Sequence, residues 1–208
     1  MKSNIIQFEK FNIHVSKDVF YPREDIDIYQ KIFRNLIKND RDFDLLELGT
    51  GTGLISIAIA KEYSSIKITA TDISQNALQN AKENAERNKV IENIKFIKSN
   101  WFSNLEDKEF NIIVSNPPYL SKKNSKHYQG LYDPDNSLYS KDDGLYDIFA
   151  IMYESKNYLK KNSYLIIEHS HNQTLYLKNF SSKCGLNYNF TMKDLIGFNR
   201  ITVFSNFI

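Results

Sequence analysis

Residues 43–72, FDLLELGTGTGLISIAIAKEYSSIKITATD, decide the fold of this 208-residue chain. They begin with an apolar run typical of a buried strand, pass through three glycines at alternate positions, and continue into an apolar helix and a second strand. A strand, a helix and another strand in this order predict a right-handed βαβ unit and a parallel sheet. Ligands of such sheets bind at the carboxyl ends of the strands, so the glycine loop is the first candidate site.

The rest of the chain continues the alternation of strands and helices. Around 43–72, we expect helices at 25–37, 74–88, 145–160 and 176–182, and strands at 94–97, 110–114, 163–167, 188–192 and 201–204. Two short β-prone runs at 5–8 and 11–15 predict an N-terminal hairpin. The expected fold is therefore α/β, a doubly wound and mostly parallel sheet with an antiparallel edge. We assign residues 1–20 to the hairpin and 21–208 to one catalytic domain, in which 116–143 lacks periodicity and is typical of a functional or a disordered loop.

The composition excludes several classes of protein. Hydrophobic residues make up 41% and charged residues 25% of the chain, which is typical of a globular protein and not of a disordered one. No apolar run approaches the roughly 20 residues that span a bilayer, and the N-terminus lacks the apolar core of a signal peptide. We therefore expect a cytoplasmic protein without a membrane partner. The net charge of +2 does not predict a large basic face for wrapping nucleic acid.

The glycine loop has the spacing G-x-G-x-G at Gly49, Gly51 and Gly53. This differs from the G-x-G-x-x-G of dinucleotide sites, and no Gly-Lys-Ser/Thr follows, so a pyrophosphate is disfavoured. The next strand ends at Asp72, where a carboxylate can accept hydrogen bonds from both hydroxyls of a ribose. These features favour S-adenosylmethionine, with Glu47 helping to hold its amino-acid end. The alternative is a tight turn in which Asp72 only caps the following helix.

The segment Asn116-Pro117-Pro118-Tyr119 follows the strand expected at 110–114. Prolines fix φ and lack an N–H, so they leave bare carbonyl groups. We interpret the Asn116 side-chain oxygen and the Pro117 carbonyl as acceptors for the two N–H groups of a planar amide or amino group, against which Tyr119 stacks. Such contacts would aim the nitrogen at a methyl sulfonium. The alternative is a strand that two prolines end, with Tyr119 covering the core.

These motifs, together with YPRED at 21–25, SNWF at 99–102 and DDGL at 142–145, give the chain a resemblance to a known family. From about residue 8 to residue 204 it resembles the HemK/PrmC family of class I methyltransferases. Members transfer a methyl group from S-adenosylmethionine to the glutamine amide in the Gly-Gly-Gln motif of peptide-chain release factors. The resemblance implies a Rossmann-like class I fold, this cofactor, and a release factor as the protein substrate.

The resemblance also implies roles for particular residues. It places the methionine end of the cofactor at the glycine loop, the ribose at the end of the second strand, the adenine in SNWF, and the substrate at YPRED and NPPY. The implied cofactor-binding residues are Glu47, Gly49, Thr50, Gly51, Gly53, Asp72, Ile73, Asn100, Trp101 and Asn116. The implied substrate-binding residues are Arg23, Asn116, Pro117, Pro118 and Tyr119. Of these, Asn116, Pro117 and Tyr119 are the expected catalytic residues. Family members usually have Asp at position 100. They also usually have an N-terminal helical domain before the hairpin, which helps to dock the release factor. In this chain, a partner subunit could supply that docking.

Other interpretations stay open. NPPY also occurs in adenine-N6 methyltransferases that act on RNA or DNA, and a non-catalytic module with the same fold is a third possibility; YPRED and DDGL favour the glutamine family. His169 and His171 form an H-x-H without a third ligand, so we expect a surface or hydrogen-bonding role and no metal. His127 is expected to be a solvated loop residue. Lysines just after NPPY would border the substrate entrance and contact phosphate if the target contains nucleic acid: Lys122, Lys123 and Lys126.

Overall fold

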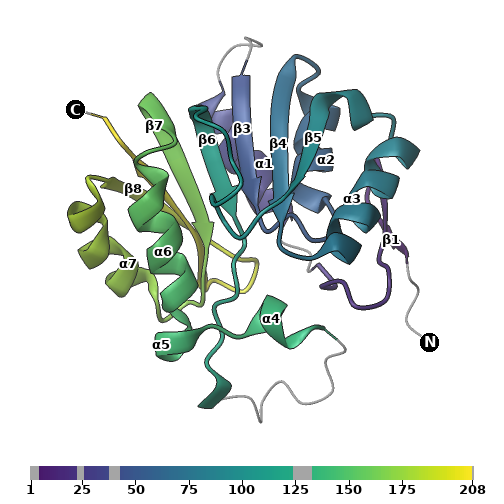
Figure 1. Cartoon of the computed structure of the whole chain (residues 1–208). Coiled ribbons are helices and arrows are strands. Elements are labelled where there is room, and N and C mark those ends of the chain that lie inside the picture. Colours follow the sequence, from purple (N-terminus) through teal and green to yellow (C-terminus); the bar gives the residue numbers. More distant parts are fainter. Residues whose placement is uncertain (1–4, 23–25, 38–42, 124–132, 208) are drawn as a thin grey trace. The chain divides into compact units, whose positions relative to one another are not determined.

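The stretch 43–72 folds as its sequence predicts. In the computed structural model, which describes residues 5–22, 26–37, 43–123 and 133–207, β3 (Phe43–Leu48) leads through the glycine loop into α2 (Leu54–Glu62) and β4 (Ile66–Asp72) (Figure 1). β3 and β4 pair in parallel along their whole length. The chain divides into two compact units, Met1–Glu106 and Asp107–Ile208.

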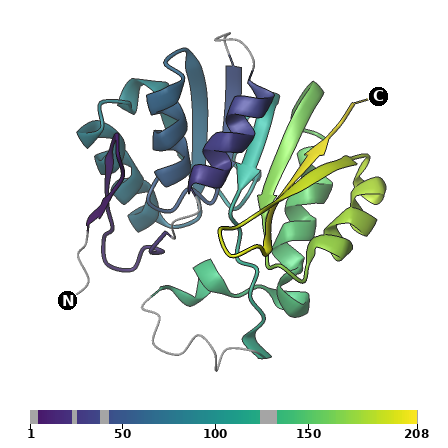
Figure 2. The same ribbon diagram turned by 180° about the vertical axis from the view of Figure 1, so that it is seen from behind.

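The first unit contains the βαβ unit that the glycine loop predicted. Its other elements are β1 (Ile5–Gln7), β2 (Asn12–His14), α1 (Ile26–Leu36), α3 (Gln75–Arg87), a 3-10 turn (Ile91–Asn93) and β5 (Ile94–Lys98). β4 also pairs in parallel with β5, so the strand order in this unit is β5-β4-β3. Figure 2 shows α1 and α2 in front of these strands. α2 is buried from Leu54 to Ala60, which explains why its sequence is apolar all around the helix.

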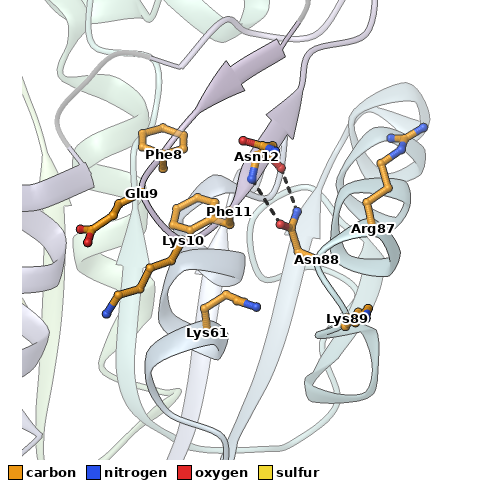
Figure 3. Close-up of a pocket in the computed structure, with 9 residues that line it drawn as sticks. All are labelled: Phe8, Glu9, Lys10, Phe11, Asn12, Lys61, Arg87, Asn88 and Lys89. Carbon is orange, nitrogen blue, oxygen red and sulfur yellow. Dashed lines mark hydrogen bonds between the residues drawn. The ribbon is translucent and has the colours of Figure 1, made fainter.

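A row of asparagines on α3 holds the N-terminal hairpin. Asn84 accepts a hydrogen bond from the His14 N–H (2.9 Å) and donates one to the His14 carbonyl (2.8 Å). Asn88 makes the same pair of bonds with Asn12, at 3.3 and 2.8 Å (Figure 3), and Asn80 continues the row toward the end of the hairpin. Four helical residues rise about 6 Å, close to the length of about 6.8 Å for two strand residues, so the side-chain amides replace a neighbouring strand.

The second unit combines a parallel pair of strands with an antiparallel edge. Its elements are β6 (Phe110–Ser115), α4 (Asp135–Leu138), α5 (Lys141–Gly144), α6 (Tyr146–Ser155), β7 (Leu159–Glu168), α7 (Thr174–Ser181), a 3-10 turn (Ser182–Cys184), β8 (Asn187–Lys193) and β9 (Asn199–Ser205). β6 and β7 are parallel, whereas β9 runs antiparallel to both β7 and β8. The strand order is β6-β7-β9-β8, with α6 and α7 in front of β7 and β8 in Figure 1. The expected mostly parallel sheet with an antiparallel edge is confirmed.

The boundary between α6 and β7 differs from the prediction. The helix expected at 145–160 ends at Ser155, and the strand expected at 163–167 runs from Leu159 to Glu168. Leu159 lies four residues after the buried Ser155, so it continues the helical spacing, but it pairs with Phe110 as the first residue of β7. Long-range strand pairing therefore overrides the local helical pattern at this position.

The segment expected to lack periodicity contains one four-residue helix, α4, which the prediction missed; in α5, Asp142 and Asp143 have left-handed φ of +51° and +55° and do not form a regular helical turn. A parallel bridge between Leu120 and Tyr139 joins its two described ends. Among the described residues, no helix is both long and apolar enough to cross a bilayer.

Candidate active site

The glycine loop is shaped by close packing at one glycine and open space at another. A Cβ on Gly53, which has φ of +82°, would lie 3.1 Å from the Ala81 Cβ and 3.2 Å from its Cα, so only glycine lets α2 and α3 approach here. A Cβ on Gly51 would meet nothing within 4 Å. The loop is fixed to β4 by the Thr50 N–H, which donates to the Thr71 carbonyl at 2.8 Å. The middle of the loop is therefore both rigid and open to a ligand.

Glu47 lies beneath this loop. It is 2% exposed, and its Oε2 accepts hydrogen bonds from the Thr50 hydroxyl (2.7 Å) and from both the N–H and the hydroxyl of Ser56. Burial raises the pKa of Glu47 to about 7, against the effect of these hydrogen bonds. Glu47 thus supports the loop from inside, and its contact with a cofactor stays a prediction.

Asp72 joins the glycine loop to the start of α3. Its Oδ2 accepts from the Gly51 N–H and its Oδ1 from the Ser74 N–H, both at 2.9 Å. The cap of α3 is Ser74, whose hydroxyl accepts from the Ala77 N–H at 3.3 Å, so Asp72 does more than cap this helix. Burial raises its pKa, which the backbone N–H groups partly offset. A carboxylate has about four acceptor positions, so after its bonds to the backbone N–H groups Asp72 keeps acceptor capacity for a ribose hydroxyl.

Trp101, from the predicted adenine segment, lies beside the same loop, and Ile73, predicted to bind the cofactor, directly follows Asp72. The ring of Trp101 lies 3.5 Å from the position that a Cβ on Gly49 would occupy. Trp101 has φ of +48°, and the Ser99 hydroxyl holds its carbonyl at 2.8 Å. Ile73 is 56% exposed although it is apolar, and Asn100 is exposed. An open loop, a carboxylate and exposed apolar surface match the amino acid, ribose and adenine of S-adenosylmethionine, so these residues fit that cofactor.

In the second unit, NPPY comes directly after β6. Asn116 is half-buried and Pro117 is buried. The Tyr119 hydroxyl donates to Glu168 Oε1 at 3.2 Å, and Glu168, at the end of β7, is only 5% exposed. The phenol ring is therefore held at the carboxyl ends of the parallel strands β6 and β7.

Gln173 holds the other side of the same segment. Its side chain is 4% exposed, and its Nε2 donates to the Tyr119 carbonyl (3.0 Å) and to the Asp143 carbonyl (3.3 Å). Its Oε1 accepts from the Ser170 N–H at 2.9 Å. Next to these bonds, a Cβ on Gly144 would lie 2.1 Å from the Tyr119 carbonyl oxygen, so the DDGL segment packs directly on NPPY. The sequence offered no pattern that identifies Gln173, because its partners are backbone carbonyls 30 and 54 residues away.

Some of the other residues singled out by the sequence lie outside the described residues, and others form ion pairs at the surface. Arg23, His127 and Lys126 lie outside the described residues. Lys122 and Lys123 form exposed ion pairs with Asp135 and Asp143, both at 3.2 Å.

His169 has the hydrogen-bonding role that was one of its two predicted roles, but it is not at the surface. It is fully buried, between the Ser170 carbonyl (2.8 Å) and the Thr202 hydroxyl (2.7 Å), and burial lowers its pKa to about 4. His171 is exposed and lies against Phe198. In the part of the chain that the structure describes, no three His, Cys, Asp or Glu side chains gather as metal ligands.

Comparison with known proteins gives concordant matches. Residues 10–130 match the family model "Methyltransferase small domain". The release factor glutamine methyltransferase of Francisella tularensis is 35% identical over 91% of this chain and 68% of its own length. That of Buchnera aphidicola subsp. Schizaphis graminum is 39% identical over 94% of this chain and 71% of its own length.

A solved structure shows the same fold at low identity. The catalytic domain of hMettl16, in complex with an RNA hairpin, has a TM-score of 0.76 and 15% identity, covering 95% of this chain and 76% of that one. At this identity the likeness carries the fold and nothing about the substrate. Together with the parallel strands and antiparallel edge, it shows the class I methyltransferase fold.

Proposed function

The chain belongs to the family of release factor glutamine methyltransferases, and from this membership we infer that it transfers a methyl group from S-adenosylmethionine to the side-chain amide nitrogen of a glutamine in a release factor. We also propose that the methylated glutamine lies in the Gly-Gly-Gln motif of the release factor. A further subunit would help to dock the release factor.

The observation that carries the residue assignment is the fixation of NPPY. The Tyr119 phenol is bound to Glu168 and the Tyr119 carbonyl to Gln173, so the segment is held from both sides. On such a rigid support, the Asn116 side-chain oxygen and the Pro117 carbonyl would accept the two N–H groups of the substrate amide. Positioning of this kind lowers the barrier because the amide does not have to be ordered during the reaction.

The first unit would hold the cofactor. The glycine loop, whose middle is open at Gly51, would take the amino-acid part, and Asp72 the ribose hydroxyls. Trp101 and Ile73 would contact the adenine. When bound, the cofactor supplies an electrophilic methyl group on a positively charged sulfur.

The acceptor residues have two tasks in this chemistry. An amide nitrogen is a weak nucleophile because its lone pair is delocalised, so Asn116 and Pro117 must orient it and stabilise the positive charge that develops on it. Both offer oxygen acceptors, which suit a nitrogen becoming more positive. As the new N–C bond forms, the bond between the methyl carbon and sulfur would break, with S-adenosylhomocysteine as the leaving group. The nitrogen would become acidic and then lose a proton to water, so the site needs no strong base.

The experiment measures methylation of a purified release factor by mass spectrometry, with isotopically labelled cofactor. We expect a mass increase of one methyl group on the glutamine of the Gly-Gly-Gln motif. Asn116→Ala should lower kcat at least 100-fold, because it removes one of the two oriented acceptors. Asn179→Ala, on an exposed face of α7, is the matched control and should leave kcat unchanged.

An adenine-N6 methyltransferase would use the same NPPY segment, so RNA and DNA oligonucleotides belong in the same assay. Methylation of adenine without any transfer to the release factor would contradict the proposal and support the alternative. Full activity of Asn116→Ala would contradict the assignment of this residue but not the substrate.

A further inference from the structure

The turn between β8 and β9 exposes large apolar side chains. Leu195 is 84% exposed, Ile196 78% and Phe198 48%, although side chains of this kind are usually buried. We call residues 194–198 the apolar turn. Single exposed apolar residues are common on proteins, but several together often mark an interaction site.

The apolar turn is held in one conformation. The carboxylate of Asp194 accepts hydrogen bonds from the N–H groups of Ile196 (3.2 Å) and Phe198 (2.9 Å) and binds the Arg200 guanidinium at 2.9 Å. The Asp194 N–H donates to the Phe198 carbonyl at 2.8 Å, and Gly197, with φ of +91°, allows the tight reversal of the chain. A surface that is already ordered loses little conformational entropy on binding, which favours recognition.

The apolar turn lies at the same edge of the sheet as NPPY. β9 begins just after the turn, and its Ile201 pairs with Glu168 at the end of β7. Glu168 is the residue that binds the Tyr119 hydroxyl. Figures 1 and 2 both show the β8–β9 turn beside the place where the chain leaves β6. The exposed side chains therefore flank the segment to which we assign the substrate glutamine.

The start of α7 extends this surface. The ring centroids of His171 and Phe198 are 4.8 Å apart, and Asn199 binds the Thr174 hydroxyl at 3.2 Å, so the two segments are joined. Leu175, in the first turn of α7, is 65% exposed. Residues 195–198, Leu-Ile-Gly-Phe, carry no charge. The surface suits an apolar protein partner and not the phosphates of a nucleic acid.

We propose that the apolar turn is a docking surface for the release factor and binds an apolar patch beside its methylated glutamine. This inference rests on the proposed function. A glutamine that reaches NPPY is attached to a folded protein, and the body of that protein must face whatever surrounds NPPY on this edge of the sheet. Among the described residues there, the apolar turn has the most exposed apolar side chains, Leu195 and Ile196.

The test compares a folded release factor with a short synthetic peptide that contains Gly-Gly-Gln. In the double variant Leu195→Ser/Ile196→Ser, we expect KM for the release factor to rise at least tenfold, equivalent to about 1.4 kcal/mol of binding. kcat and the affinity for S-adenosylhomocysteine should stay within twofold. Methylation of the peptide, which lacks the protein body, should not change.

Two further variants make the result decisive. Tyr153→Ser on α6, where the tyrosine is 54% exposed, is the matched control and should change nothing. Leu195→Arg is a second disruption of the apolar turn in case the double variant does not fold, which circular dichroism would reveal.

An unchanged KM for the release factor in a folded turn variant would overturn the docking inference, as would an equal loss of peptide methylation. If instead light scattering shows that the variants lose self-association while KM stays the same, the turn binds a second copy of the chain and the inference is wrong. Failure of the unmodified chain to methylate either substrate would contradict the proposed function itself.

Discussion

Glu47 and His169 are buried side chains whose proton binding changes on folding in opposite directions. The pKa of Glu47 rises from its ordinary 4.5 to about 7, so the native state binds more protons than the unfolded state in this range, and stability falls as pH rises through it. The pKa of His169 falls from 6.5 to about 4, so the native state binds fewer protons and stability rises with pH. The two contributions oppose each other between about pH 4.5 and 6.5.

Replacing Glu47 should expose the contribution of His169. We compare the free energy of unfolding of Glu47→Gln with that of the unmodified protein. As pH rises from 4.5 to 7, the difference should change in favour of the variant by at most about 3 kcal/mol. Urea denaturation at four pH values measures this difference. Glu86→Gln, an exposed position on α3, is the control for the loss of one carboxylate. Parallel curves for Glu47→Gln would show that Glu47 titrates near its ordinary pKa.

At the scale of elements, the asparagine row on α3 joins the hairpin to the glycine loop. Besides its two bonds to His14, the fully buried Asn84 donates to the Thr52 carbonyl at 3.0 Å. Asn84→Ala leaves the N–H of His14 and the carbonyl of Thr52 without this partner, and each orphaned group costs about 1–3 kcal/mol. We expect a loss of about 3 kcal/mol in the free energy of unfolding, measured by chemical denaturation.

Asn76→Ala, on the exposed face of the same helix, should cost less than about 1 kcal/mol. Hydrogen exchange gives a second readout, because the hairpin amides should lose protection in Asn84→Ala and keep it in Asn76→Ala. Equal stability of the two variants would mean that the asparagine row does not hold the hairpin.

Most elements were predictable where a local pattern matches the final environment. Residues 43–48 are mostly apolar and are buried from Leu45 to Leu48, and Ser74 is a standard helix cap, so both boundaries are correct within a residue or two. The start of β7 was not predictable, because Leu159 fits a helix locally and only its pairing with Phe110 decides its state. The same holds for the asparagine row, since nothing local distinguishes a buried Asn84 from a solvated one.

In the candidate site too, residues with a local sequence pattern were predictable and residues that act through long-range contacts were not. Gly51, Asp72 and NPPY stand out in the sequence because their residue types and spacing are unusual. Gln173 and Glu168 do not, because they act on backbone or phenol groups brought near by the fold. The exposure of Leu195 and Ile196 was equally hidden, since an apolar pair in a sequence more often indicates a core.

At the scale of the whole molecule, the proposed cofactor-binding residues belong to the first compact unit except for Asn116, and the proposed acceptor segment NPPY belongs to the second. Binding of a nucleoside ligand and methyl transfer should therefore respond to different substitutions. Ligand that binds only the native state raises stability by about 2.7 kcal/mol at 100 times its Kd. For a chain of this length, that corresponds to an increase in Tm of about 5 to 11 °C.

We expect S-adenosylhomocysteine to produce such a shift in the unmodified protein and in Asn116→Ala, measured by differential scanning fluorimetry at one ligand concentration. Asp72→Ala should lose most of the shift, because it removes the proposed acceptor for the ribose hydroxyls. This holds even if the Tm of Asp72→Ala without ligand is lower than that of the unmodified protein. Since each variant is compared with itself, a general loss of stability does not imitate the effect. If the ligand raises the Tm of Asp72→Ala as much as that of the unmodified protein, Asp72 does not bind the cofactor. If the ligand no longer raises the Tm of Asn116→Ala, NPPY contributes to cofactor affinity as much as the first unit does.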